Sequence, residues 1–384
     1  MLPCLKSMSG ARVTSITGHD AAGCYALAST VGARVHPTVT ALIADPEVDV
    51  VYIATPPGTH ASIAIEVARA GKPCVIETVM ARTGEEARVI VEEFQRLHLP
   101  VYVNQARRFH VRIMALRHLL SSNQIGSIVS LNYTLATHLS STHLASGWRT
   151  SAELAGGGPI VEYATELFDI VSFLFGTITQ VNGDASHRVD VFNSIASSSS
   201  APSSSTLQPI ETQASCTFRC IDGANQPINC SANFSILGRT SGPSSSHLID
   251  TLQFVGTNGA ITMPLFSDEL PQVNIRGTPH RIQLPTSAPS STTLSSPFLQ
   301  HVTSELRLWR SGAISSSNSS NISSSNSSLP HFASVSSLDG LRISHCVDSL
   351  LRSYYRQRSD SFWIRPETWK HNRETETIVG NKEK

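Results

Sequence analysis

Residues 48–77, VDVVYIATPPGTHASIAIEVARAGKPCVIE, decide the fold of this chain. A run rich in Val and Ile stops at two prolines, an apolar-periodic segment follows, and Gly71 precedes a second short apolar run. This order predicts a strand, a tight turn, a helix and a parallel strand, joined by a right-handed crossover. Ligands bind beyond the carboxyl ends of strands in such sheets. The residues expected on this rim are Thr55, Pro56, Pro57, His60 and Glu77.

The segments on either side repeat the alternation of strand and helix. The expected strands are 12–18 and 100–106, and the expected helices are 20–31, 39–46 and 83–94. Thr83 is a suitable N-cap for the last of these helices, because its hydroxyl can accept a hydrogen bond from the first turn. Alternating strands and helices predict a doubly wound α/β domain, which we assign to residues 1–106.

Residues 107–384 show a different pattern. Segments that alternate apolar and polar residues predict an antiparallel sheet with one solvated face, and periodic segments predict helices that cover the other face. The alternating segments are 127–138, 213–221, 227–235, 249–255 and 271–276, and the helical ones are 111–122, 160–175 and 341–354. This part is therefore expected to be an α+β domain.

Serine-rich tracts interrupt the second part of the chain. They lie at 194–206, 242–247, 286–296 and 311–328. These tracts hold too few apolar residues to offset the entropy lost on ordering, so they are expected to be disordered insertions between ordered elements.

Composition narrows the class of protein. Lys+Arg and Asp+Glu are equal at 29 each, which gives no electrostatic reason to expect nucleic acid or an anionic membrane as a partner. No apolar run approaches the roughly eighteen residues of a membrane-spanning helix. The 7 cysteines are odd in number and lack metal-ligand spacing, which favours reduced thiols and predicts no metal site. These features predict a cytoplasmic protein.

The order of motifs resembles the Gfo/Idh/MocA oxidoreductases. The matching text includes ADPEVDVVYIATPPGTHASIAIEVARAGKPCVIE, RRF at 107–109, GWR at 147–149 and GGGPIVEYATELFDIVSFLFG at 156–176. The resemblance implies a Rossmann domain followed by a large, mostly antiparallel sheet, which makes residues 107–384 the domain for substrate binding and oligomerisation. It also implies hydride transfer between NAD(P) and a sugar, polyol or similar small hydroxy compound. Homo-oligomers that pair through the open face of this sheet are implied as well.

The resemblance also implies which residues form the site. Those expected to bind the cofactor or face the substrate are Thr55, Pro56, Pro57, His60, Glu77, Arg107, Trp148 and Arg149. Family members use a lysine in E-K-P and a histidine in D-x-x-x-H for acid–base chemistry. Here Thr78 follows the glutamate, and Glu162 and Glu166 align with the aspartate and the histidine. These three are the candidate catalytic residues, because repulsion between neighbouring carboxylates can raise the pKa of one of them.

Two positions near the start of the chain bear on the cofactor. The family's first strand and G-x-G-x-x-G turn are not found before RVTSITGHD at 12–20. We therefore expect a truncated Rossmann domain with an unpaired strand edge and without the backbone N–H groups that hold the pyrophosphate. Gly18 stands where NAD-preferring members carry an acid, and His19 follows it, which favours NADP.

Other hypotheses stay open. The changed catalytic positions are also compatible with a non-catalytic descendant that acts as a ligand- or protein-binding module. Glu162, Glu166 and Asp169 share a helical face, and they either pair with arginines, face solvent, act in catalysis or hold a metal ion. For Arg108, a salt bridge to a neighbouring carboxylate is the preferred interpretation.

Overall fold

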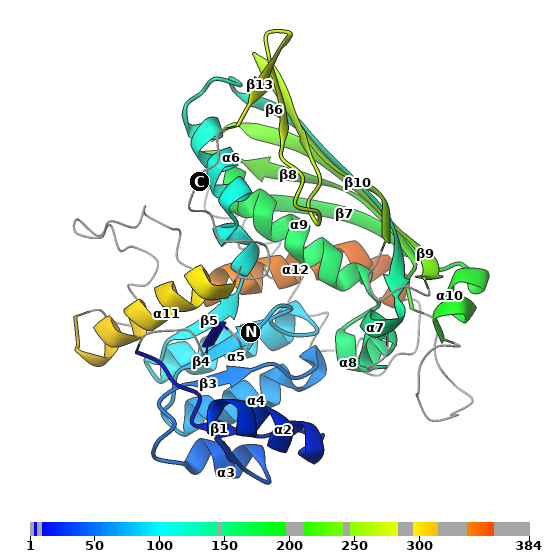
Figure 1. The fold of residues 1–384 in the computed structure, drawn as a ribbon. Coiled ribbons are helices and arrows are strands. Elements are labelled where there is room, and N and C mark those ends of the chain that lie inside the picture. The colour runs from blue at the N-terminus through cyan, green and yellow to red at the C-terminus, as the bar shows by residue number, and fades with distance from the viewer. Residues whose placement is uncertain are drawn as a thin grey trace, which may run out of the picture.

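Three β-sheets organise the chain in a computed structural model (Figure 1). The structure describes residues 4–5, 10–144, 147–196, 210–223, 225–240, 246–282, 295–313 and 336–356. Two short parallel sheets belong to the first part of the chain, and an 8-stranded sheet belongs to the second. The predicted fold class is therefore confirmed: Rossmann-like parallel strands precede a large, mostly antiparallel sheet with helices. The division at residues 106 and 107 stays a prediction.

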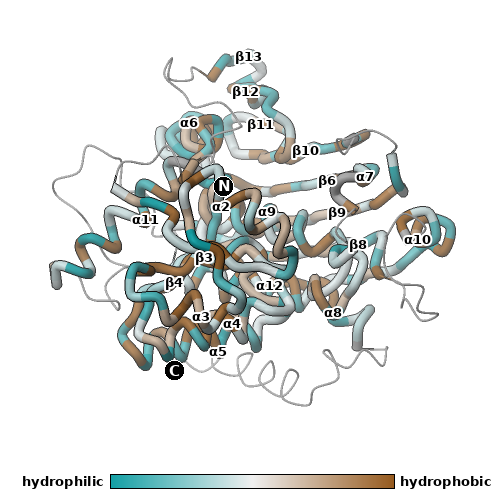
Figure 2. The backbone as a smooth tube through the Cα atoms, turned by 60° about the horizontal axis from the view of Figure 1, so that its bottom comes forward, coloured by the Kyte–Doolittle hydropathy of each residue, from teal (hydrophilic) through white to brown (hydrophobic). Residues whose placement is uncertain are grey.

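The stretch 48–77 forms the centre of the first part. The 3-stranded sheet has the order β3-β4-β5, made of β3 (Val51–Ile53), β4 (Cys74–Glu77) and β5 (Val101–Asn104). Helix α4 (Pro57–Arg69) connects the first two strands, and α5 (Gly84–Arg96) connects the last two. Figure 2 shows the hydrophobic colouring of β3 and β4, as expected for strands covered on both faces.

Local sequence explains where these two helices begin. Pro57 occupies the first turn of α4, where the missing N–H of proline costs nothing. The Thr83 hydroxyl accepts a hydrogen bond from Glu86 N at 3.2 Å and caps α5, as the sequence predicts. Both helices therefore start directly after the turns that follow β3 and β4, which fixes the rim on which ligands are expected.

The first strands form a sheet of their own. β1 (Ser15–Ile16) pairs in parallel with β2 (Arg34–Val35), a strand that the sequence analysis did not predict. They are connected by α2 (Ala21–Val31), and α3 (Val39–Ala44) leads on to β3. Within the described ranges, neither β1 nor β3 has a strand on its other edge. The central strand that the sequence is expected to lack would lie between these two edges, beside β1 and β3.

The large sheet has the order β13-β12-β11-β10-β6-β9-β8-β7, with β6 and β9 parallel and all other neighbours antiparallel. Its strands are β6 (Ile128–Ser140), β7 (Thr177–Ser186), β8 (Gln213–Ile221), β9 (Pro227–Thr240), β10 (Ser246–Gly256), β11 (Gly259–Met263), β12 (Gln272–Ile275) and β13 (Thr278–Arg281). Buried and exposed residues alternate along β8 and β9. One face is therefore solvated.

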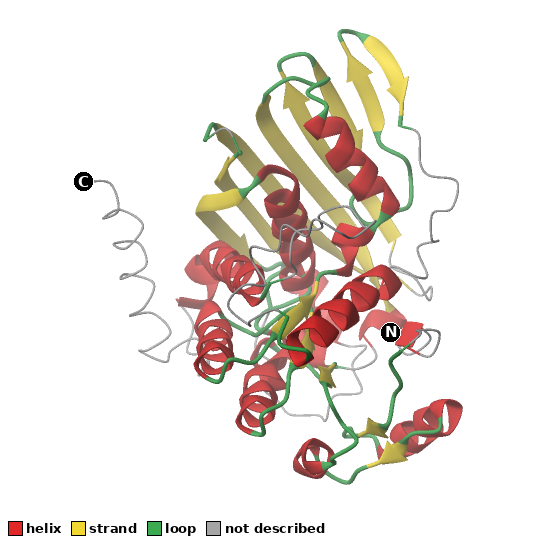
Figure 3. Cartoon of the chain, turned by 90° about the vertical axis from the view of Figure 1, so that its left-hand side faces the viewer, coloured by secondary structure: helices red, strands yellow, loops and turns green. Residues whose placement is uncertain are grey.

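Helices cover the other face of this sheet (Figure 3). They include α6 (Val111–Ser121), α9 (Ile160–Phe175) and α12 (Ser337–Arg356). Phe168 of α9 meets Phe218 of β8 edge-to-face, with ring centroids 5.3 Å apart. Among the helices in the described ranges, none is long and apolar enough to cross a bilayer.

Several elements were not predicted from the sequence. They are β7, β11, β13, η1 (Ala106–Phe109), α7 (Ser141–Leu144), η2 (Trp148–Thr150), α8 (Ala152–Ala155), α10 (Val189–Ala196) and α11 (Ser295–Arg310). Helix α11 covers one face of the parallel sheet, where Phe298, Leu299 and Val302 join a cluster with Val75 and Tyr102. It escaped prediction because its first residues continue a serine-rich tract.

The predicted serine-rich insertions fall mostly outside the described residues. Their margins need correction, because α10 extends through Ser194 to Ala196, β10 begins at Ser246, and α11 begins at Ser295. Ser246 pairs with His138 of β6, so the neighbouring strand overrides the local preference of serine for loops.

Candidate functional site

A polar cluster lies at the carboxyl ends of the parallel strands. Glu77, the last residue of β4, accepts hydrogen bonds from the Tyr52 hydroxyl on Oε1 at 2.6 Å and from the Asn104 amide on Oε2 at 2.9 Å. The Asn104 amide also donates to Tyr52 Oη at 3.1 Å. Burial and the Glu77 carboxylate raise the pKa of Tyr52 well above its usual value. The phenol therefore stays a donor, and Glu77 is held as an acceptor at the predicted rim.

His60 connects two loops of this rim. The imidazole is 1% exposed, with Nε2 2.7 Å from Thr55 O and Nδ1 2.9 Å from Val79 O. Burial lowers the pKa of His60. Because both ring nitrogens face backbone carbonyls, the side chain positions the turn at Thr55 against the segment after β4. The expected contact between His60 and a cofactor stays a prediction.

The other predicted residues of this rim lie around the same turn. Pro56 is the N-cap of α4, with Pro57 directly after it. The Thr55 hydroxyl accepts a hydrogen bond from Thr59 Oγ1 at 2.7 Å. After β4, the Thr78 hydroxyl donates to Asn104 O at 2.5 Å. That bond uses the hydroxyl proton of Thr78 and leaves its oxygen free to act as an acceptor.

Helix α9 carries three acidic residues, and each forms an ion pair with an arginine outside the helix. Glu162 pairs with Arg149 at 2.8 Å, Glu166 with Arg107 at 2.9 Å and Asp169 with Arg108 at 2.6 Å. The arginines come from η1 and η2, the two short helices at Ala106–Phe109 and Trp148–Thr150. Of the roles that the sequence leaves open for these three carboxylates, the structure shows pairing with arginine. It also shows the salt bridge that the sequence analysis prefers for Arg108.

Burial divides these pairs into an inner one and two outer ones. The side chains of Arg108 and Asp169 are both 3% exposed, and Arg108 also binds Asp339 at 3.1 Å. Burial raises the pKa of Asp169 to about 6, although Arg108 favours the ionised form. Burial likewise raises the pKa of Glu162, opposed by Arg149. The inner pair is enclosed in the protein, whereas the side chains of the two outer pairs are partly exposed, by 20–30% each.

An aromatic group lies beside the Arg107–Glu166 pair. The Phe266 ring centroid is 4.8 Å from the Arg107 Cζ, 4.9 Å from the Tyr163 ring and 5.8 Å from the His247 ring. Asp250 fixes this segment by accepting the backbone N–H of Phe266 at 2.6 Å. Sequence reasoning missed Phe266 and His247, because neither belongs to a motif and both approach α9 only through the fold.

Trp148 lies under the neighbouring guanidinium. The Arg149 Cζ is 4.1 Å from the centroid of the Trp148 ring, a cation–π contact. Because Arg149 also binds Glu162, this ring adjoins one of the outer ion pairs. Its predicted contact with a cofactor or substrate stays a prediction.

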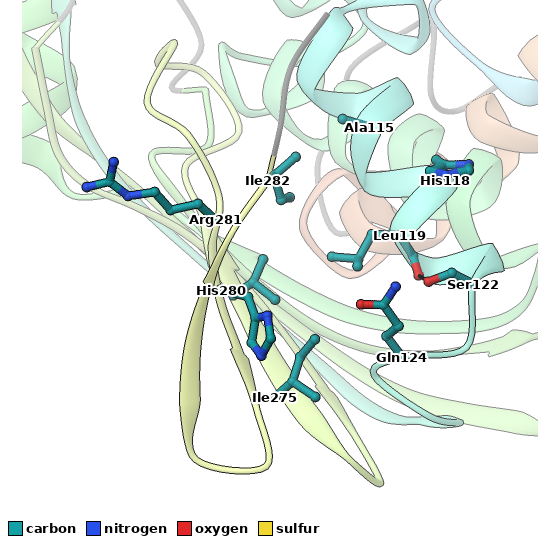
Figure 4. A pocket seen from close by; sticks show the side chains of 10 residues that line it. Ala115, His118, Leu119, Ser122, Gln124, Ile275, His280, Arg281 and Ile282 are labelled. Atoms are coloured by element: carbon teal, nitrogen blue, oxygen red, sulfur yellow. Dashed lines mark hydrogen bonds between the residues drawn. The ribbon is translucent and has the colours of Figure 1, made fainter.

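A separate hollow of about 250 Å³ lies between α6 and the β12–β13 hairpin. Figure 4 shows side chains around this hollow, with His118 on α6, Gln124 in the turn after it and His280 on the hairpin. None of the predicted site residues lines this hollow. Elsewhere in the described ranges, no group of three or more His, Cys, Asp or Glu is arranged to hold a metal ion.

Comparison with known proteins agrees with the fold and the motifs. Residues 1–105 match the model of the oxidoreductase family with an NAD-binding Rossmann fold, and residues 113–262 match the GFO/IDH/MocA C-terminal domain.

Two curated relatives illustrate the similarity. Levoglucosan dehydrogenase of Pseudarthrobacter phenanthrenivorans is 32% identical over 142 residues, which cover 37% of this chain and 36% of that protein. Inositol 2-dehydrogenase 2 of Saccharopolyspora erythraea is 38% identical over 130 residues, which cover 33% and 38% respectively. The aligned part thus spans less than half of either relative.

Among solved structures, a levoglucosan dehydrogenase in complex with NADH and levoglucosan superposes with a TM-score of 0.67. The alignment covers 93% of this chain and 92% of that one at 19% identity, a level that speaks for the fold alone. Both family models match, and the parallel strands and large sheet follow in the expected order. The chain belongs to the Gfo/Idh/MocA oxidoreductase family.

Proposed function

We propose that this chain is an NAD(P)-dependent oxidoreductase that acts on a small hydroxylated compound such as a sugar or polyol. The observation that carries the proposal is the Tyr52–Glu77–Asn104 cluster at the carboxyl ends of the parallel strands, the edge where such sheets bind ligands. The relatives named as levoglucosan and inositol dehydrogenases support the substrate class.

The rim fits one end of the cofactor. Each oxygen of Glu77 accepts one hydrogen bond, and a carboxylate oxygen can accept a second, so Glu77 has capacity for a ribose hydroxyl. When bound, the nicotinamide supplies a hydride acceptor or donor. Gly18 stands where NAD-preferring members of the family carry an acidic residue, and this difference supports NADP over NAD.

The pyrophosphate end does not fit the described residues equally well. By resemblance the pyrophosphate lies on a G-x-G-x-x-G turn, and none is found among the described residues before β1. The turn after β1 holds Gly18 and His19, which align with the position of the adenosine ribose. No chemical step is therefore assigned through the cofactor, and the proposal depends on the rim at Glu77.

The two outer ion pairs suit a hydroxylated substrate. Arg107 and Glu166 place a donor beside an acceptor, as do Arg149 and Glu162, and a sugar hydroxyl both donates and accepts. The Trp148 ring offers an apolar face next to the second pair. Within the proposal, Glu162, Glu166 and the Thr78 oxygen bind the substrate hydroxyls, and Glu166 is the group expected to take up the proton.

Cofactor binding tests the first half of the proposal. Titrating the protein with NADPH and NADH, with fluorescence as the readout, is expected to give saturable binding that the Glu77→Gln variant weakens by about tenfold. Glu92→Gln is the matched control, because Glu92 lies on the exposed side of α5, 57% exposed. A parent protein that binds neither nucleotide would contradict the proposal.

Turnover tests the second half. Activity is measured with a panel of polyols and NADP. Glu166→Gln is expected to abolish this activity, while its unfolding midpoint stays close to that of the Glu92→Gln control. Unchanged turnover in that variant would remove Glu166 from catalysis.

A second candidate is a non-catalytic member that binds a ligand or a protein. It is favoured by one observation: all three carboxylates of α9 are already engaged in ion pairs with arginines, at positions where the resemblance implies acid–base groups. Saturable binding of nucleotide or polyol without any turnover would select this candidate.

We also propose a homo-oligomer and a cytosolic location. The solvated face of the large sheet presents small polar side chains such as Asn132, Ser231 and Thr217, and it is the face expected to pair with a second copy. Ser231 donates to Asn132 at 2.8 Å on this face. All 7 cysteines are buried thiols, which suits a reducing compartment. Light scattering that gives the mass of a monomer would contradict the oligomer.

A further inference from the structure

His247 lies at an open part of the large sheet. Strand β10 pairs with β6 from Ser246 onward, whereas β11 pairs with β10 only from Leu252. The first residues of β10 thus have a neighbouring strand on one side only. The imidazole faces α9, with its ring centroid 6.2 Å from the Tyr163 ring and 5.8 Å from the Phe266 ring.

The two ring nitrogens of His247 have different surroundings. Nδ1 is enclosed and has no hydrogen-bond partner among the described residues, whereas Nε2 is not enclosed in this way. A neutral imidazole carries one N–H, and a buried N–H without an acceptor is rarer than a buried acceptor without a donor. The proton therefore belongs on Nε2, which makes that nitrogen a donor.

Burial keeps the ring neutral. It lowers the pKa of His247, Asp250 opposes this effect, and Arg107 adds a smaller lowering effect. The Arg107 guanidinium is already engaged by Glu166 and by the Leu265 carbonyl. The donor character of Nε2 thus does not depend on protonation of the ring.

His247 is one of the residues that line a pocket of about 430 Å³. The lining polar groups carry hydroxyl, amide and carboxylate functions, and no lysine or arginine is among the lining residues. Leu248 and Leu270 add apolar surface and are 65% and 52% exposed. Hydrogen-bonding groups beside apolar surface suit an uncharged ring that carries hydroxyl groups, and the lack of cations disfavours an anion.

We propose that this pocket binds an uncharged polyhydroxylated molecule and that His247 donates Nε2–H to one of its hydroxyl oxygens. Phe266 connects the pocket to the Arg107–Glu166 pair, since its ring contacts both the guanidinium and the imidazole. The pocket thereby extends the proposed substrate site, and the inference rests on the substrate class proposed above.

Ligand-observed NMR without nucleotide tests this inference separately from cofactor binding and turnover. The probes are myo-inositol, levoglucosan and glucose, each measured alone with the full chain. At least one probe is expected to bind. His247→Phe, which keeps a ring against Tyr163 and Phe266, is expected to weaken that binding by roughly 3- to 10-fold. His247→Gln, which returns an N–H near the position of Nε2, is expected to restore most of it.

His118→Phe is the matched control, because His118 lines the separate hollow beside α6. Its affinity for the probe is expected to equal that of the parent. If none of the three probes binds, or if His247→Phe binds as well as the parent, the inference is overturned. Probe binding by a parent that fails to bind NADPH would support the pocket and contradict the oxidoreductase proposal, so the two failures are distinguishable.

Discussion

Asp348 of α12 makes stability depend on pH in a way that one substitution tests. The side chain is 3% exposed, and its Oδ2 accepts the backbone N–H of Gly84 at 2.7 Å, at the first turn of α5. Its Oδ1 has no partner among the described residues. Burial raises the pKa of Asp348 from 3.8 to about 7, although the bond from Gly84 favours the ionised form.

The sign follows from where the proton is bound. Because the pKa is higher in the folded state, the folded protein retains a proton that the unfolded chain has lost, and stability falls as pH rises toward 7. Between about pH 5 and about pH 8, the shift corresponds to a loss of roughly 2–3 kcal/mol in the free energy of unfolding. Asp348→Asn removes the titration. Its amide oxygen can still accept from Gly84, and any cost of the unpaired amide NH₂ is constant with pH.

Urea unfolding at the two pH values gives the free energies to compare. The difference between parent and Asp348→Asn is expected to move by roughly 2–3 kcal/mol in favour of the variant as the pH is raised. Other titrating groups are common to both proteins and cancel. Asp49→Asn is the control, because Asp49 is 66% exposed. Equal pH slopes in parent and Asp348→Asn would refute the reasoning about this buried carboxyl.

Three further stability predictions follow from single contacts. Arg108→Met leaves Asp169 buried without its cation and is expected to cost about 3–5 kcal/mol, whereas adding Asp169→Leu in the same chain should restore most of that loss in urea unfolding. Gly183→Ala would place a Cβ 2.7 Å from Leu350 Cα; backbone of α12 cannot yield cheaply, so a loss of about 1–3 kcal/mol is expected from thermal unfolding. Thr83→Ala removes the cap of α5 and should cost about 1 kcal/mol, with Thr83→Ser as the control that keeps it; equal stability of the two variants would contradict the capping role.

Elements with local signals were predictable from the sequence. Helix α9 begins and ends where its flanking glycines and proline place it, and the rim at Glu77 follows from one βαβ stretch. Strand β7 was missed because its pairing partner, β8, begins only at Gln213, beyond the intervening helix α10. The ion pair between Arg107 and Glu166 joins residues 59 positions apart. No local pattern encodes such a separation, so the sequence predicted the residue types of the site but not their partners.

The pairing of the α9 carboxylates changes what the family positions can do in this chain. By resemblance, those positions carry acid–base groups, yet here Glu162 and Glu166 bind Arg149 and Arg107. Each carboxylate already accepts a hydrogen bond from a guanidinium, so each pair places a donor beside an acceptor and is suited to orient hydroxyl groups. His247 differs, because no carboxylate binds its enclosed nitrogen. Only the Phe266 ring separates this neutral imidazole from Arg107. His247 can therefore supply a hydrogen-bond donor where the carboxylates of α9 supply acceptors, and the proposed ligand site includes β10 as well as α9.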